Sequence, residues 1–415
     1  MKEYFYDITI IGGGPAGMAA AVEAAEGGVP RILILERDVQ LGGILQQCIH
    51  DGFGIHRFGQ RLSGCEYAQR YIDLVKEKTV DVMLDTMVLE LTADKELYAV
   101  NASVGMMHIK SRAVILAMGC RERTASQVFI CGSRPAGVLT AGSVQRYINV
   151  EGYLPGKEAV ILGSGDIGLI MARRMTMEGI YVKGVYEAAA NPGGLTRNIV
   201  QCLQDYHIPL HLSKTVVKVH GKQHIEGVTI ADVGEGFVPV SGTEQYIPCD
   251  LLVLAVGLIP ENELSKNAGI VLDPGTKGPV VDNYMMTNIP GIFAAGNVAA
   301  VFDLVDFVSE TGAIAARGAV KYLNGELQDD TEYIPVQAGE NVNVLIPQRI
   351  RKDAGGKANI YLRVCRKLQK NELICQEGTD VKVTRKSIHA VPSEMMAFSA
   401  QFDRDGDITV KIREV

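Results

Sequence analysis

Short apolar runs that lead into glycine alternate along the chain with stretches that favour helix. The first run covers residues 7–11, a helical stretch follows to about Ala25, and a second apolar run spans 31–35. Two later runs, at 113–119 and 250–260, are also of the buried-strand type and contain a glycine after the apolar residues. Strands that alternate with helices predict a parallel sheet and an α/β fold.

The turn after the first strand carries a Gly-x-Gly-x-x-Gly sequence at Gly12, Gly14 and Gly17. The first glycine permits a tight turn, the second lets a phosphate approach the backbone, and the third lets the helix pack on the strand. The N-terminus of the helix then offers N–H groups to phosphates. Glu36 follows the second strand, where a carboxylate accepts hydrogen bonds from ribose hydroxyls. This spacing predicts a βαβ unit that binds a dinucleotide.

The same features recur later in the chain at one constant offset of 151 residues. The pairs that share this offset are Gly12 with Gly163, Glu36 with Glu187, and Gly42-Gly43 with Gly193-Gly194. Three coincident features are hard to obtain by chance. The repeat therefore predicts two nucleotide-binding units, one for each of two cofactors.

Charge and hydropathy exclude several other classes of protein. The chain has 41 Lys and Arg against 48 Asp and Glu, a net charge of −7, whereas nucleic-acid binders usually present a basic face. The apolar run at 251–256 is far shorter than the ~20 residues that cross a bilayer. Residues 1–7 lack the basic and then apolar pattern of a signal peptide. We expect a cytoplasmic protein with no membrane span and no nucleic-acid partner.

The cysteines do not form any familiar redox or metal motif. They are Cys48, Cys65, Cys120, Cys131, Cys202, Cys249, Cys365 and Cys375. No two are separated by two residues, which excludes a CxxC redox pair and the common zinc and iron–sulfur spacings. We expect reduced, mostly buried thiols and no metal site.

Residues 287–298 read Thr-Asn-Ile-Pro-Gly-Ile-Phe-Ala-Ala-Gly-Asn-Val. Together with the two glycine motifs, this segment resembles the two-dinucleotide-binding flavoproteins of the pyridine nucleotide–disulfide reductase fold, over residues 5–325. The resemblance implies that the first unit binds FAD, that the inserted second unit binds NAD(P)H, and that residues 287–298 close the flavin site.

The implied fold is α/β, with two Rossmann-like domains and a small C-terminal β-rich domain. The FAD-binding domain would comprise residues 1–125 and 261–328, with a connecting segment at 126–155 and the NAD-binding domain at 156–260. Residues 331–415 contain short alternating runs separated by turn residues, which predicts strands. These runs are 343–346, 359–364, 380–384 and 407–412.

The resemblance also assigns cofactor-binding residues one by one. For FAD they are Gly12, Gly14, Pro15, Ala16, Gly17, Glu36, Arg37, Gly43, Val88, Ala117, Met118, Gly119, Gly296, Asn297 and Thr311. For NAD they are Gly163, Gly165, Asp166, Ile167, Gly168, Glu187, Val256 and Gly257. The family usually has Asp where Asn297 stands, and this Asp accepts a hydrogen bond from the flavin ribityl chain. Asn still offers its amide oxygen for that bond.

Cys48 and His50 are the candidate catalytic residues, because the segment after Gly43 runs along the flavin in this fold. They would tune the flavin or deliver a proton to it. The alternative is that they only pack and support a hydrogen-bonded turn. The disulfide reductases place a second cysteine in this segment or a CxxC pair in the NAD unit, and neither is present. We therefore do not expect a dithiol reductase.

Two segments, 42–54 and 134–142, point to a closer resemblance. They resemble the FAD/NAD subunits of multi-component dehydrogenases, of the cyanide-forming glycine dehydrogenase and opine oxidase types. They also resemble bacterial oxidoreductases that accompany a glycerol-3-phosphate-dehydrogenase-like flavoprotein and a small Cys-rich protein.

We therefore predict an FAD-dependent oxidoreductase that passes hydride or electrons between NAD(H) and a partner redox protein or a small-molecule acceptor. Glu187 favours NAD over NADP, because a carboxylate repels a 2′-phosphate. The partner would be a flavoprotein or an iron–sulfur or Cys-rich subunit, in an oligomer or hetero-complex. Two alternatives stay open: a stand-alone NADH oxidase or small-molecule dehydrogenase, and a mainly structural nucleotide-binding subunit.

Overall fold

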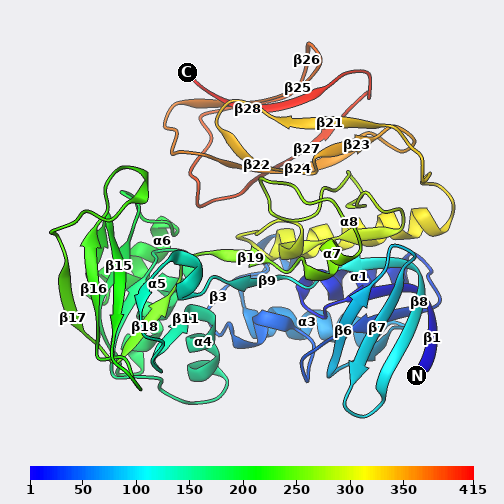
Figure 1. The fold of residues 1–415 in the computed structure, drawn as a ribbon. Helices are drawn as coiled ribbons and strands as arrows, with labels where there is room; N and C mark the ends of the chain where they lie inside the picture. Colours follow the sequence, from blue (N-terminus) through cyan, green and yellow to red (C-terminus); the bar gives the residue numbers. More distant parts are fainter. The chain divides into compact units, whose positions relative to one another are not determined.

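The computed structural model describes residues 1–415, which form two compact units (Figure 1). Unit 1 comprises Met1–Cys120 and Pro260–Val415, and unit 2 comprises Arg121–Ile259. The chain passes between them in β9 (Cys120–Glu122) and β19 (Leu258–Pro260). Unit 2 is therefore inserted into unit 1 in sequence, as the resemblance implies. No helix combines the length and the apolar composition needed to cross a bilayer.

Unit 1 is built on a seven-stranded sheet of order β5-β2-β1-β8-β7-β6, in which β20 also pairs with β8. The strands are β1 (Lys2–Ile11), β2 (Ile32–Leu35), β5 (Asp81–Met83), β6 (Thr86–Leu91), β7 (Glu96–Asn101), β8 (Gly105–Leu116) and β20 (Ile292–Ala294). The strands β5, β2, β1, β8 and β20 are parallel, whereas β6 and β7 are antiparallel. The four residues of β2 are all buried, as expected for a parallel strand covered on both faces.

Two helices of unit 1 lie against each other beside this sheet (Figure 1). They are α1 (Pro15–Glu26) and α8 (Val305–Leu323). A Cβ atom on Gly312 of α8 would lie 2.1 Å from the carbonyl oxygen of Ala16, so only glycine permits this approach. A third helix, α3 (Gly64–Lys76), begins with a capping box formed by Ser63 and Glu66. The remaining short elements of this part are η1 (Gly43–Gln47), β3 (Asp51–Phe53), α2 (Ile55–Phe58), β4 (Leu62–Ser63), α7 (Glu263–Asn267) and η5 (Gly296–Val298).

The C-terminal part of unit 1 is a β-domain with its own hydrophobic core. Its two sheets have the orders β23-β21-β28-β25-β26 and β22-β24-β27. The strands are β21 (Tyr333–Ala338), β22 (Val342–Ile346), β23 (Arg349–Arg351), β24 (Lys357–Val364), β25 (Asn371–Glu377), β26 (Asp380–Lys386), β27 (Met396–Gln401) and β28 (Ile408–Glu414). The four expected runs lie in β22, β24, β26 and β28, and four further strands complete the sheets.

Buried polar contacts join this β-domain to the rest of unit 1. Arg351 is fully buried and pairs with Asp282 at 3.2 Å and with Asp353 at 2.7 Å. Burial raises the pKa of Asp282, and the positive charge of Arg351 opposes that shift. Glu310 of α8 accepts hydrogen bonds from Asn359 and Tyr361 of β24, each at 2.7 Å. The β-domain is therefore anchored on the helix that follows residues 287–298.

Unit 2 has a parallel sheet of order β11-β18-β12-β13-β14 and a second sheet of order β10-β15-β16-β17. The strands are β10 (Cys131–Gly132), β11 (Val138–Thr140), β12 (Glu158–Leu162), β13 (Tyr181–Glu187), β14 (Leu210–Leu212), β15 (Lys214–His220), β16 (Gly227–Asp232), β17 (Gln245–Pro248) and β18 (Leu251–Leu254). The helical elements are η2 (Ala125–Val128), α4 (Ala141–Asn149), α5 (Asp166–Met177), α6 (Thr196–Asn198), η3 (Ile199–Gln204) and η4 (Glu235–Phe237).

Residues 126–155, which we expected to be only a connecting segment, contribute β10, β11 and α4 to unit 2. The backbone of β11 pairs with β18, and that of β10 pairs with β15. Short strands of two or three residues carry no periodic pattern long enough to read from sequence. Residues 126–155 therefore contribute a strand to each of the two sheets of unit 2.

We predict that Arg351→Ala lowers the free energy of unfolding by about 3–5 kcal/mol, because it leaves Asp282 buried without its cation. Arg366→Ala is the matched control, since it removes an exposed pair with Glu414 (2.9 Å) that solvent screens, and it should leave stability almost unchanged. Urea denaturation measures both values. Equal losses in the two variants would contradict this account of the buried pair.

Candidate functional site: two glycine loops and their acidic residues

The glycine loop of unit 1 connects β1 to α1, and each glycine has a separate structural role. Gly12 has φ +104°, and a Cβ atom there would lie 2.4 Å from the carbonyl oxygen of Ala117. A Cβ atom on Gly17 would lie 1.9 Å from the carbonyl oxygen of Gly12. The Cβ position of Gly14, in contrast, has no atom within 4 Å. The loop is thus closed by backbone contacts at two glycines and open at the third.

The glycine loop of unit 2 repeats this arrangement between β12 and α5. Gly163 has φ +101°, and its Cβ position lies 2.1 Å from the carbonyl oxygen of Ala255. The Cβ position of Gly168 lies 2.5 Å from the carbonyl oxygen of Gly163. Gly165 again faces open space, with no atom within 4 Å. The two open positions, Gly14 and Gly165, are where a pyrophosphate can approach the backbone.

Each loop is held by the acidic residue that follows the second strand. Glu36 accepts hydrogen bonds from the backbone N–H of Gly13 (2.7 Å) and of Asp38 (2.8 Å). Glu187 accepts from the N–H of Ser164 (2.9 Å), from its hydroxyl (2.7 Å), and from the N–H of Ala189 (2.9 Å). The partners stand at the same offset of 151 residues as the acids. The repeat therefore extends to individual hydrogen bonds.

Both carboxylates keep capacity for a ligand. An ionised carboxylate accepts about four hydrogen bonds. Two are used at Glu36 and three at Glu187. Ribose hydroxyls can therefore still be accepted at each site, as the sequence predicts.

The two Gly-Gly pairs, Gly42-Gly43 and Gly193-Gly194, also make equivalent contacts with the two glycine loops. The N–H of Gly42 donates to the carbonyl oxygen of Gly13 at 2.9 Å, and the N–H of Gly193 donates to the hydroxyl of Ser164 at 2.8 Å. The Cβ position of Gly43 lies 3.2 Å from the Cα atom of Gly14. These segments lie directly on the glycine loops, so a larger residue at Gly43 would press on the open position.

The segment 296–311 lies against the first glycine loop. The N–H of Gly296 donates to the hydroxyl of Thr311 at 3.0 Å, and the Cβ position of Gly296 lies 2.9 Å from the Cβ atom of Ala16. Asn297 accepts from the N–H of Phe302 at 3.0 Å and donates to the thiol of Cys120 at 3.5 Å. The Asn297 oxygen thus keeps only one lone pair for the ribityl hydrogen bond that the resemblance implies.

The candidate catalytic cysteine, Cys48, lies beside a second cysteine that the sequence does not single out. The Cys48 thiol is buried and donates to the carbonyl oxygen of Ile44 at 3.3 Å. The Cys65 thiol donates to the carbonyl oxygen of Gln46 at 3.3 Å, and burial raises its pKa. Hydrogen bonds to carbonyl oxygens favour the protonated thiol. The ring of His50 lies 5.1 Å from that of Phe53.

The other expected residues occupy the following places in the fold. Pro15 begins α1, Val88 is buried in β6, and Arg37 is exposed directly after β2. Ala117, Met118 and Gly119 follow β8, and Val256 and Gly257 follow β18. Ile167 is part-buried in α5. Asp166 begins α5, and its carboxylate accepts from the N–H of Leu195 (2.9 Å) and from the side chain of Asn198 (2.7 Å), both in the chain after Gly194.

Comparison with known proteins identifies this architecture. A family description of pyridine nucleotide-disulphide oxidoreductases matches residues 6–318. The chain belongs to this family. Members are FAD-dependent NAD(P)H oxidoreductases, and FAD and NAD(P)H are the cofactors of this family. The expected α/β fold with two dinucleotide-binding units is confirmed. The matched region ends before the C-terminal β-domain.

Several curated relatives of this family are similar to the chain. The HcnB subunit of the hydrogen cyanide synthase of Pseudomonas protegens is 28% identical, over 70% of this chain and 66% of that protein. An opine oxidase subunit of Agrobacterium tumefaciens is 28% identical, over 72% of this chain and 62% of that protein. The chain thus spans slightly less than two thirds of these two relatives. Thioredoxin reductase of Listeria monocytogenes is 27% identical, over 80% of this chain and 98% of that protein.

A solved structure shares the fold. Thioredoxin reductase of T. acidophilum superposes with a TM-score of 0.61 at 23% identity, over 76% of this chain and 98% of that one. The family fold therefore accounts for the two glycine loops and for the order of the strands around them.

The glycine contacts generate a prediction for the flavin-free protein. Gly17→Ala should lower the free energy of unfolding by about 1–3 kcal/mol, because the added methyl group overlaps the Gly12 carbonyl oxygen. Gly14→Ala should leave it almost unchanged, since the position is open and its φ of −75° suits any residue. Thermal unfolding of the two purified variants compares them. If Gly14→Ala lost more free energy of unfolding than Gly17→Ala, the assignment of Gly14 as the open position would be contradicted.

Proposed function

We propose that this protein passes electrons between NAD(H) and a second redox centre through FAD, with FAD bound by unit 1 and NAD(H) by unit 2. The observation that carries the proposal is the duplicated loop, in which Gly14 and Gly165 are open while their neighbours are closed by backbone contacts. Two such sites in one chain serve two dinucleotides. Flavin supplies the chemistry of hydride acceptance, and the chain binds and orients the two cofactors.

In this proposal the FAD site comprises the first glycine loop, Glu36, Gly43 and the segment from Gly296 to Thr311. The N-termini of α1 and α8 would each offer N–H groups and partial positive charge to negatively charged parts of the cofactor. Asp306 lies in the first turn of α8 and accepts from the N–H of Arg57 at 3.0 Å. The negative charge of Asp306 therefore partly offsets the positive partial charge at the N-terminus of α8.

The second site favours NAD over NADP. The Glu187 carboxylate occupies the position at which a 2′-phosphate would be repelled. Lys183, which precedes it in β13, pairs with Glu158 at 2.7 Å and donates to the carbonyl oxygen of Pro248 at 2.6 Å. This lysine is engaged near the other end of the strand. Nothing in these contacts supplies a cation to offset the repulsion at Glu187.

Electrons would leave the flavin for a docked partner rather than through a dithiol. The thiols of Cys48 and Cys65 both donate to carbonyl oxygens, and burial raises the pKa of Cys65, which disfavours its nucleophilic thiolate. HcnB and the opine oxidase relative are each named as subunits of larger enzymes. We therefore propose a cytoplasmic subunit whose partner is a flavoprotein or an iron–sulfur or Cys-rich protein.

A second candidate is an NADH oxidase or dehydrogenase that works alone. NADH dehydrogenase of Bacillus subtilis is 27% identical over 77% of this chain, which favours this alternative. It predicts rapid turnover of the isolated chain with oxygen, a quinone or a dye. The subunit proposal predicts slow turnover with these acceptors despite fast reduction of the flavin.

The test is an anaerobic titration of the purified protein followed by its visible spectrum. We expect a flavin band that bleaches at about one equivalent of NADH. NADPH should reduce the flavin more slowly, because Glu187 repels its 2′-phosphate. A bound flavin that neither nucleotide reduces would contradict the proposed electron transfer and favour a structural role. Equal rates with both nucleotides would contradict only the assigned role of Glu187.

A further inference from the structure

One face of strand β24 makes its contacts outside the β-domain. Side chains at every second position of a strand share a face. The positions of β24 that belong to the core of the β-domain are Ala358, Ile360, Leu362 and Val364. The opposite face presents Asn359, Tyr361 and Arg363, and each of them bonds to the chain between Val301 and Glu310. This face of β24 therefore serves an interface within unit 1.

Tyr361 lies at the centre of this interface. It is 1% exposed and belongs to the core around the glycine loop rather than to the core of the β-domain. Its ring lies edge-on to those of Phe302 and Phe307, with centroids 5.3 and 5.4 Å away. Burial and the charge of Glu310 raise the pKa of Tyr361, so its hydroxyl stays protonated and donates to Glu310 at 2.7 Å. The β-domain thereby holds residues on both sides of the start of α8.

Arg363 holds the turn that precedes α8. Its guanidinium donates to the carbonyl oxygen of Val301 at 3.0 Å and pairs with the carboxylate of Asp303. The N–H of Met395, just before β27, donates to the same carboxylate at 2.6 Å. The side chains of Arg363 and Asp303 are only 16% and 20% exposed, so water and salt screen their attraction weakly. Two points of the β-domain therefore fix the turn at residues 301–303.

This turn is joined directly to the proposed FAD site. The N–H of Phe302 donates to the side-chain oxygen of Asn297 at 3.0 Å. The residue before Asn297 is Gly296, whose Cβ position lies 2.9 Å from the Cβ atom of Ala16 in α1. The segment from 296 to 310 thus lies between the first glycine loop on one side and β24 on the other.

We infer that Tyr361 and Arg363 of β24 are positioning residues of the FAD site. They act through residues 297–310 and hold this segment in the conformation that binds the flavin. A segment that is already ordered loses less conformational entropy when a ligand binds. The β-domain, which lies outside the region that the family description matches, thereby contributes to cofactor affinity. The inference rests on the proposed binding of FAD by unit 1.

Arg363→Gln tests the inference in the purified holoenzyme. The variant removes the positive charge and keeps a polar side chain. It should raise the FAD dissociation constant at least ~10-fold, because hydrogen bonds of a charged group that order the segment are lost. The rise in flavin fluorescence on dilution measures the release of FAD. The visible band of the flavin that stays bound should also change in shape, because Asn297 is no longer held in one orientation.

A double-mutant cycle with Asp303→Asn separates positioning from a general loss of stability. If the pair acts as one unit, the double variant should bind FAD no more weakly than Arg363→Gln alone. Two losses that multiply would overturn the inference. Tyr361→Phe provides a milder second variant, because it keeps the ring and removes only the hydrogen bond to Glu310. It should raise the dissociation constant ~3-fold or more.

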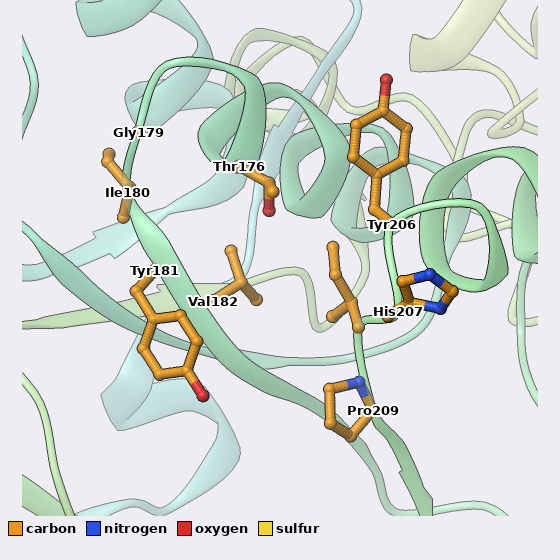
Figure 2. A pocket seen from close by; sticks show the side chains of 9 residues that line it. Thr176, Gly179, Ile180, Tyr181, Val182, Tyr206, His207 and Pro209 are labelled. Atoms are coloured by element: carbon orange, nitrogen blue, oxygen red, sulfur yellow. The ribbon is translucent and has the colours of Figure 1, made fainter.

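Two control variants should bind FAD like the wild type. Arg366→Ala removes an exposed ion pair in the same β-domain. Tyr181→Ser changes unit 2, where Tyr181 lies beside a hollow of about 350 Å³ (Figure 2). All the residues that line this hollow belong to unit 2. A control that released FAD as readily as Arg363→Gln would overturn the inference.

Failure of the inference can be told apart from failure of the proposed function. If Arg363→Gln and Tyr361→Phe both bound FAD with the affinity and spectrum of the wild type, the inference alone would be overturned. A wild-type protein that binds no FAD would contradict the proposed function, and the inference with it.

Discussion

The carbonyl oxygen of Gly12 lies where a side chain on Gly17 would have to be, only 1.9 Å from the missing Cβ atom. This close approach fixes the start of α1 against the end of β1, and the structure around the glycine loop of unit 1 depends on it. With α1 in place, α8 packs along it through Gly312, and Gly296 comes to lie against Ala16. One backbone contact thus determines where two helix N-termini and the segment 296–311 meet.

The same constraint operates a second time at Gly163 and Gly168, and this repetition explains why the chain has two nucleotide units. Glycine is required at the closed positions for packing, whereas at Gly14 and Gly165 the space is empty. Packing therefore gives no reason for glycine at these two positions, and the approach of a ligand does. The carboxylates of Glu36 and Glu187 hold the loops in this state by accepting backbone N–H groups.

Features that depend on local backbone geometry could be predicted from the sequence. The glycines and the two acids belong to this class, because the chemistry requires these residue types at fixed spacing. The insertion of one unit in the other was implied only by the family resemblance. Contacts between distant segments could not be predicted. Cys65 meets the segment of Cys48 only because α3 starts beside η1, and the Asp166 carboxylate accepts from the side chain of the distant Asn198. The strands at 131–140 were too short to show a pattern.

The central claim is that the two loops bind different cofactors, and a pair of matched variants tests it most directly. Gly14→Ala and Gly165→Ala place the same methyl group at equivalent open positions. We expect Gly14→Ala to be purified without its flavin. Gly165→Ala should keep the flavin and its visible band, and NADH should fail to bleach that band. If both variants kept the flavin and were reduced by NADH like the wild type, the assignment of the two loops would be contradicted.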